Sequence, residues 1–271
     1  MKIIDCVLFY NEIDLIKYRL EILNDTVDNF VIVESTHTFT GHPKSLHFKN
    51  NSHMFEKFKD KITYIIVDDM PYKQPNVDFS KREQWHNEYF NRNCISRGID
   101  KLNLSDDDII MGTDLDEIPN PEILSKIKYS EISIDRIASL SLDIYYYNLT
   151  SRVVEDLYGT FLITYKFYKS LNMTFQQLRT DCNERIYPQN IIRNGGWHLD
   201  HFGDEYTMLY KLQTSSHQEY NTPFFTDLNY IRKCITERSS VFTPGKMFTY
   251  IDTCNNPNMP PKWETYLSKY R

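Results

Sequence analysis

Residues 109–119, with the sequence IIMGTDLDEIP, contain the pattern that decides the fold. The apolar run Ile109 to Met111 predicts a short strand buried on both faces, and polar residues follow it at once. Asp114 and Asp116 stand two apart on this extended segment, so both carboxylates can reach one side of the sheet edge. Two hard oxygen ligands on one side suit Mg²⁺ or Mn²⁺, with substrate phosphates completing the coordination shell.

Three earlier strands are predicted to end in the same way, with polar residues just beyond an apolar run. The runs are Ile3 to Phe9, Phe30 to Val33 and Ile62 to Val67, and the polar residues after them are Asn11, Glu12, Glu34, Asp68 and Asp69. The alternation of strands with helical patterns predicts an α/β fold, Rossmann-like, with a mostly parallel central sheet flanked by helices. Ligands bind along the carboxyl edge of such a sheet, which is where these polar residues would gather.

Two helices are predicted between these strands. Apolar residues at three- and four-residue spacing predict the first from Ile13 to Leu23. The second should run from about Ser80 to Gly98, because Ser80 followed by Glu83 matches a capping box and a glycine suits the carboxyl end. Later strands are predicted at 140–147 and 161–168, with a helix ending near 212 and a tail that wraps the domain.

Composition excludes several classes of protein. The net charge of −6 and the absence of a basic run argue against a nucleic-acid partner, whose phosphates attract positive surfaces. An acidic protein can still bind a nucleotide diphosphate if a divalent cation bridges the two. The 5 cysteines are scattered and predict neither a disulfide framework nor a zinc site. No signal peptide and no run of ~20 apolar residues is recognised, so we expect a cytoplasmic protein without a membrane span.

Six short segments occur in an order that resembles glycosyltransferase family 17. They are Phe9-Tyr10-Asn11-Glu12, Val33-Glu34-Ser35, the Trp85, Glu88, Arg92, Asn93 helix, Asp114 to Pro119, Gly196-Trp197-His198 and Ser216-His217-Gln218-Glu219. The resemblance extends over roughly residues 1 to 240. It implies a GT-A fold, an inverting reaction and a UDP-sugar donor, with N-acetylglucosamine the usual sugar of the family and xylose or another hexose as alternatives. The implied acceptor is the hydroxyl of a glycan.

The resemblance also assigns roles along the chain. Asp114 and Asp116 would bind the diphosphate metal, and Asn11 and Glu34 would lie where GT-A enzymes hold the nucleoside. We expect one domain over 1–271: a nucleotide-sugar-binding half at 1–120, an acceptor and metal-completing half at 121–240, and a wrapping tail at 241–271.

A third metal ligand and a general base are sought in the second half of the chain. Neutral imidazole is a good ligand for Mn²⁺, and we rank His217 above His198, with His201 behind them. An inverting transfer needs a base near the acceptor hydroxyl, and a carboxylate is the usual choice. The candidate bases are Asp200, Glu184 and Glu117, with Asp204 and Glu205 as further options.

Two arginines and a tryptophan have two interpretations each. Arg82 and Arg92 would share a face of the predicted helix, and either could bind a donor diphosphate or form an ordinary ion pair with Asp68, Asp69 or Glu88. Trp197 could stack on a sugar or pack in the core.

Two other functions remain as alternatives. A sugar-phosphate nucleotidyltransferase would normally have a glycine-rich loop after its first strand, where this chain has Tyr10-Asn11-Glu12. A non-catalytic carbohydrate-binding protein would have no need to keep both aspartates of the D-x-D motif.

Overall fold

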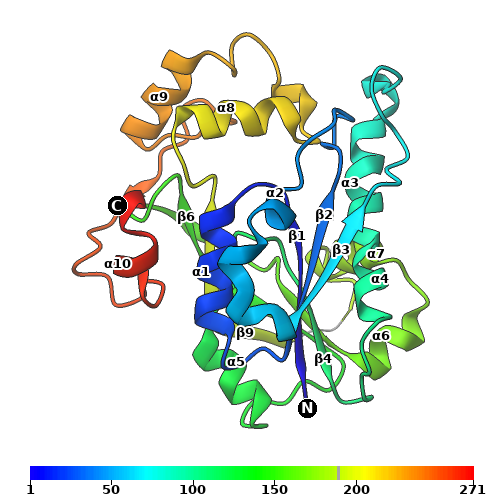
Figure 1. Ribbon diagram of the computed structural model, residues 1–271. Helices are drawn as coiled ribbons and strands as arrows, with labels where there is room; N and C mark the ends of the chain where they lie inside the picture. The colour runs from blue at the N-terminus through cyan, green and yellow to red at the C-terminus, as the bar shows by residue number, and fades with distance from the viewer. Residues whose placement is uncertain (188–189) are drawn as a thin grey trace.

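A computed structural model describes residues 1–187 and 190–271 (Figure 1). One sheet runs through the described chain, with the strand order β10-β7-β6-β8-β4-β1-β2-β3, and β9 joins it through β6 and β5. The strands are β1 (Ile3–Phe9), β2 (Asn29–Ser35), β3 (Ile62–Val67), β4 (Ile109–Gly112), β5 (Glu117–Pro119), β6 (Ile137–Tyr146), β7 (Ser151–Leu157), β8 (Phe161–Thr164), β9 (Asn190–Asp200) and β10 (Thr249–Tyr250).

The predicted α/β fold is confirmed in the first half, where β3, β2, β1 and β4 pair in parallel. The two helices that cover the opposite faces of this parallel unit are α1 (Ile13–Leu23), as predicted, and α4 (Ile95–Ile99). The second half is mixed, because β8 lies antiparallel to both β4 and β6, whereas β9 runs parallel to β6.

Alternate side chains of β1 enter two separate cores. Ile3, Val7 and Phe9 pack on the face that carries α1, and Ile4 and Cys6 pack on the opposite face. This is the pattern expected of a strand buried on both sides. The first face also carries α2 (His47–Asn50), η1 (Ser52–Lys61) and α5 (Pro121–Lys128), and the second carries α6 (Tyr165–Leu171) and α7 (Phe175–Asn183).

The single long helix predicted from Ser80 to Gly98 is wrong in two respects. It is divided into η2 (Phe79–Lys81), α3 (Glu83–Asn93) and α4. The cap at its start is also different: Asp78 accepts a hydrogen bond from the backbone of Ser80, and Glu83 accepts one from the backbone of Asp78. The first break occurs at Arg82, which has a φ of 59° and is therefore not helical, and the second occurs at Cys94, between α3 and α4.

Helices α8 (Glu205–Thr214) and α9 (Leu228–Glu237) lie beyond the carboxyl edge of the sheet, with α9 packed on α8 toward the side of β6 (Figure 1). A third hydrophobic cluster joins them to the end of β6 through Met208, Leu212, Ile231 and Tyr147. The remaining short helices are η3 (Gln218–Tyr220), α10 (Trp263–Tyr266) and η4 (Ser268–Tyr270). Within the described ranges, no helix combines the length and the apolar character that crossing a bilayer would require.

Strand β9 changes its register against β6 part-way along its length. Leu140 lies opposite Ile192, whereas Leu142 lies opposite Gly196, so β9 bulges between these two points. Gly196 has a φ of 148°, and a Cβ atom there would lie 2.1 Å from the carbonyl oxygen of Ile118 on β5. A glycine is therefore required where β9 meets β5.

We expect Gly196→Ala to lower the free energy of unfolding by about 3 kcal/mol, because it combines an unfavourable φ with a backbone clash. Gly245→Ala is the matched control: Gly245 has a φ of 87° but nothing within 4 Å of a Cβ, so backbone strain of about 1 kcal/mol is expected. Urea unfolding of both variants measures the difference. Equal losses would show that the approach of β5 is not what requires the glycine.

Candidate active site

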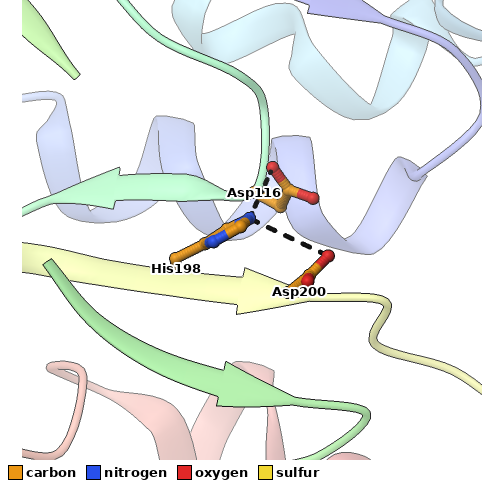
Figure 2. Close-up of side chains that lie close together, drawn as sticks. All are labelled: Asp116, His198 and Asp200. Carbon is orange, nitrogen blue, oxygen red and sulfur yellow. Dashed lines mark ion pairs between the residues drawn. The ribbon is translucent and has the colours of Figure 1, made fainter. Parts of the chain in front are cut away.

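Asp116, His198 and Asp200 come together beyond the carboxyl edge of the sheet (Figure 2). The Nε2 atom of His198 lies 3.5 Å from Oδ1 of Asp116 and 3.9 Å from Oδ1 of Asp200. One potential ligand atom from each of the three side chains lies within 4.8 Å of the other two. The three residues are therefore close enough to share a single cation.

Strand pairing brings these residues together from distant parts of the sequence. Asp116 directly precedes β5, and β5 pairs antiparallel with β9, so that Glu117 lies opposite His198. His198 and Asp200 are two apart on β9 and therefore point to the same side. The sequence placed Asp116 at this edge, and the pairing of β9 supplies the other two side chains.

Two adjoining cavities open at the triad. The first, here called the arginine cavity, measures about 500 Å³ and is lined by residues that include Arg92, Asp114, Asp116, His198 and Asp200. The second, called the tyrosine cavity, measures about 380 Å³ and lies between the start of α1 and helix α8. Asp116 and Lys211 line both cavities. Their volumes are of the size that binds small ligands.

Asp114 is held by two arginines. Its Oδ1 atom accepts a hydrogen bond of 2.6 Å from Arg92, and its Oδ2 atom accepts one of 2.7 Å from Arg179. Burial alone would raise the pKa of the Asp114 carboxyl, but the charges of Arg179 and Arg92 hold it below its usual value. Both carboxylate oxygens of Asp114 are therefore bound by arginines, which neutralise its negative charge. Asp114 lies beside the cluster of Asp116, His198 and Asp200.

Arg179 on α7 also binds Glu117. The guanidinium donates to Glu117 at 2.8 Å, and the hydroxyl of Thr160 donates to the same carboxylate at 3.0 Å. Glu117 is buried and is not among the residues that line the two cavities. Its contacts make it a structural anchor of the loop after Asp116.

Arg19 on α1 also fixes the loop that carries Asp114 and Asp116. Arg19 forms two hydrogen bonds of 2.7 Å with Asp5 on β1, and both side chains are fully buried. Its Nη1 atom also donates to the carbonyl oxygens of Glu117 at 2.6 Å and Leu115 at 3.2 Å. This buried ion pair therefore holds the loop through its backbone. Neither Asp5 nor Arg19 was predicted from the sequence to support the site.

The charges within the triad shift its pKa values. Burial by itself would lower the pKa of the His198 imidazole, but the carboxylates of Asp200 and Asp116 raise it to about 9. Burial would raise the pKa values of the two carboxyls, yet each is lowered: that of Asp116 chiefly by His198, and that of Asp200 by His201 and His198. The two ionised carboxylates of Asp116 and Asp200 therefore stabilise a positive charge placed between them.

A comparison with families of known proteins matches residues 1–262 to glycosyltransferase family 17. This chain belongs to glycosyltransferase family 17. The predicted family and the expected enzyme class, a glycosyltransferase, are thereby confirmed.

Three mammalian relatives share sequence with part of this family 17 chain. The enzymes named beta-1,4-mannosyl-glycoprotein 4-beta-N-acetylglucosaminyltransferase from Rattus norvegicus and Homo sapiens are each 31% identical to it over 122 residues. The matched region is 44% of this chain and 22% of each relative, and the enzyme of the same name from Mus musculus is 30% identical over 122 residues.

A solved structure with a similar arrangement is 4-diphosphocytidyl-2C-methyl-D-erythritol synthase from Anaerococcus prevotii. The likeness covers 80% of this chain and 98% of that one, with 7% sequence identity and a TM-score of 0.41. We draw no functional conclusion from a likeness of this extent.

The two residues expected at the nucleoside lie in different surroundings in this family 17 chain. Asn11 lines the tyrosine cavity. Glu34 is fully buried, and its carboxylate accepts hydrogen bonds from Tyr64 at 2.6 Å and from Lys44 at 3.2 Å. Glu34 does not line either cavity, so its contacts fix the end of β2.

The other expected histidines and arginine are placed as follows. His217 lines the arginine cavity, but it is exposed, and its Nδ1 atom lies 2.7 Å from Glu219. His201 is next to the triad, where it pairs with Asp200 and stacks on Tyr146. Arg82 stacks on Trp85, with its guanidinium 5.5 Å from the ring centroid. It lies at the break before α3 and is not in the set lining either cavity.

The remaining candidates fall outside the triad. Glu184 is exposed at the end of α7, Asp204 caps the start of α8, and Glu205 pairs with Arg232. Trp197 packs in the core and donates from its indole nitrogen to the carbonyl oxygen of Asn258 at 2.6 Å, so the core interpretation holds in the structure. Lys211 on α8 was missed: its Nζ atom lies 3.8 Å from Asp116, and a lone lysine in a helical pattern gives no signal in sequence.

Proposed function

We propose that this chain transfers N-acetylglucosamine from a UDP donor to a hydroxyl of a mannose-containing glycan, with inversion, and that the transfer depends on a divalent cation. The family supports glycosyl transfer, and the printed names of the relatives supply the sugar and the acceptor class. The observation that carries the proposal is the Asp116, His198, Asp200 cluster in a cavity that also contains Arg92.

The geometry of the cluster fits a small cation. An ion about 2.1 Å from its ligands holds adjacent ligand atoms ~3 Å apart and opposite ones ~4.2 Å apart. The separations of 3.5 and 3.9 Å around His198 Nε2 lie within that interval. Two carboxylates and an imidazole suit Mn²⁺, and Mg²⁺ is the alternative. We therefore assign the cation to Asp116, His198 and Asp200, with Asp114 supporting Arg92.

Each side chain of the arginine cavity has a part in this proposal. The cation, when bound, would offset negative charge on the departing diphosphate. Arg92 lines the same cavity and can donate to phosphate oxygens in the planar geometry that guanidinium provides. Lys211 lines the cavity with its Nζ atom 3.8 Å from Asp116 and supplies a second positive charge there. The ion pair with Asp114 holds Arg92 in place, which lowers the entropic cost of binding.

Thermal unfolding with UDP, GDP and CMP, each with and without Mn²⁺, tests the proposal. We expect UDP with Mn²⁺ to raise the melting temperature by about 5 to 10 °C at a ligand concentration near 100 times Kd. Asp116→Asn should abolish the shift, whereas Asp107→Asn, at an exposed position before β4, should leave it intact. A UDP shift that persists without metal and in Asp116→Asn would contradict the assigned site.

Product analysis then separates this function from its rivals. The transferase should release UDP from UDP-N-acetylglucosamine, and a panel of UDP-xylose, UDP-glucose and UDP-galactose identifies the donor sugar. A nucleotidyltransferase would instead form pyrophosphate from a nucleoside triphosphate and a sugar phosphate. A carbohydrate-binding protein would consume no donor.

A further inference from the structure

The tyrosine cavity adjoins the metal cluster but differs from the arginine cavity in its walls. Tyr10 and Tyr210 lie in contact with each other on its lining, with ring centroids 5.9 Å apart and hydroxyl oxygens 3.2 Å apart. Phe202 and Tyr270 form a second aromatic pair on its lining, with centroids 5.3 Å apart. Aromatic faces of this kind pack against the C–H faces of sugar rings, and phenol groups can hydrogen-bond to sugar hydroxyls.

The groups suited to a diphosphate line only one of the two cavities. The tyrosine cavity has three carboxylates on its lining, Glu12, Asp14 and Asp116, against one cation, Lys211. The arginine cavity also has more carboxylates than cations on its lining, but Arg92, His198 and Asp200 line that cavity and not the tyrosine cavity. The groups that would bind a diphosphate and its cation therefore face the arginine cavity. Neutral polyols suit the tyrosine cavity, because carboxylates accept hydrogen bonds from hydroxyl groups. The two cavities are therefore suited to two different substrates.

Glu12 lies where these substrates would meet. It precedes α1 and is one of the residues that line both cavities. Its side chain makes no cap hydrogen bond to α1, and its Oε2 atom accepts one from the backbone of Asn11 at 3.0 Å. Glu12 was not among the bases expected from the sequence. Of the three main candidates, Glu117 is bound to Arg179, Asp200 belongs to the proposed cation site, and Glu184 is exposed at the end of α7.

We propose that the tyrosine cavity is the acceptor subsite, that it takes a neutral mannose-containing glycan, and that Glu12 is the general base. Asn11, which lines this cavity, then faces the acceptor and not the nucleoside that the family resemblance implied. This inference rests on the proposed function. The acceptor hydroxyl gives its proton to the Glu12 carboxylate while its oxygen bonds to the anomeric carbon of the donor. The bond from that carbon to the diphosphate breaks, and UDP leaves with the electron pair.

Tyr210→Ala tests the subsite, with methyl β-mannoside and a mannotriose as acceptor probes. We expect the acceptor KM to rise about tenfold to thirtyfold, as for an aromatic contact residue, while the donor KM and the shift with UDP and Mn²⁺ stay unchanged. Tyr210→Phe should change KM less than threefold because the ring remains. Tyr206→Ala is the matched control, since Tyr206 lies one turn earlier on α8, is 60% exposed and does not line either cavity.

Glu12→Gln tests the base. We expect kcat to fall at least a hundredfold and its low-pH limb to disappear, with both substrates still bound. An unchanged acceptor KM in Tyr210→Ala, or loss of UDP binding in that variant, would overturn the acceptor assignment. With Mn²⁺ kept saturating at every pH, an intact low-pH limb in Glu12→Gln would overturn the role of Glu12.

Acceptor binding can also be measured without a donor, by saturation-transfer NMR with the mannotriose. If the wild-type protein binds the mannotriose and Tyr210→Ala does not, the subsite stands even if UDP gives no thermal shift. That result would contradict the proposed donor chemistry and leave the acceptor site standing. If the wild-type protein shifts with UDP and Mn²⁺ but shows no mannotriose signal, the subsite fails and the donor site stands.

Discussion

Replacement of Arg19 by methionine is expected to lower the free energy of unfolding by about 3 to 5 kcal/mol, because it leaves the Asp5 carboxylate buried without a partner. Both side chains of this pair have 0% exposure. The loss can be measured by urea unfolding. Lys57→Met is the matched control: the Lys57 side chain pairs with Glu21 but is 58% exposed, so the expected loss is below about 1 kcal/mol.

A double variant separates the charge from the loop. Asp5→Leu combined with Arg19→Met removes both charges, so much of the lost stability should return. The carbonyl oxygens of Leu115 and Glu117 would still lack the hydrogen bond from Arg19, although Thr113 also donates to that of Glu117. We therefore expect the double variant to fold but to bind UDP with Mn²⁺ more weakly than the wild-type protein. A loss below about 1 kcal/mol in Arg19→Met would show that the pair contributes little.

Binding of Mn²⁺ is expected to strengthen about a hundredfold between pH 6 and pH 8, because His198 must lose a proton to become a ligand. Although burial lowers the pKa of His198, Asp200 and Asp116 raise it to about 9. A raised pKa means that the His198 imidazole of the metal-free protein stays protonated through this range. Because the proton must leave before Mn²⁺ can bind, the apparent affinity for Mn²⁺ falls about tenfold for each unit by which the pH is lowered. An ordinary histidine of pKa ~6.5 would give a gain of only about fourfold.

Calorimetric titration in two buffers with different heats of ionisation measures both quantities. About one proton should be released for each Mn²⁺ bound near pH 7.5. His198→Gln should weaken binding and flatten its pH dependence, whereas His217→Gln should preserve both. A fourfold gain in the wild-type protein, or a flattened profile in His217→Gln, would indicate that His198 is not a ligand or lacks the raised pKa.

Apolar runs and their polar ends were sufficient to predict the first half of the fold. β1 and α1 begin and end at the predicted residues, because a continuous apolar run and a helical spacing have few other interpretations. The break between η2 and α3 was missed, since it depends on Arg82 adopting a positive φ, and sequence does not mark this for arginine. A strand was predicted at 161–168, but the antiparallel pairing of β8 with β4 and β6 was not. Pairing partners depend on contacts between residues far apart in sequence.

Residues at the edge of the sheet could be predicted from the sequence, but most of the interactions between them could not. Asp116 and His198 were both singled out, but the interactions of Asp114 with Arg92 and Arg179 could not be foreseen. Arg179 lies 65 residues beyond Asp114 and reaches it because α7 packs beside α3. Glu34 was likewise expected to contact the nucleoside, because it lies near the end of a strand. In the fold it is buried and hydrogen-bonded to Tyr64 and Lys44.

The bulge in β9 determines where this chain can change in length. Residues before Ile192 and residues after Gly196 pair with β6 in two independent registers. An insertion or deletion before the bulge can be absorbed there without moving His198 or Asp200. Insertion or deletion of a single residue between Gly196 and His198 would turn the side chains of His198 and Asp200 to the opposite face of the strand. The cluster with Asp116 would then be lost. Length variation among related chains should therefore be common on the first side of the bulge and absent on the second.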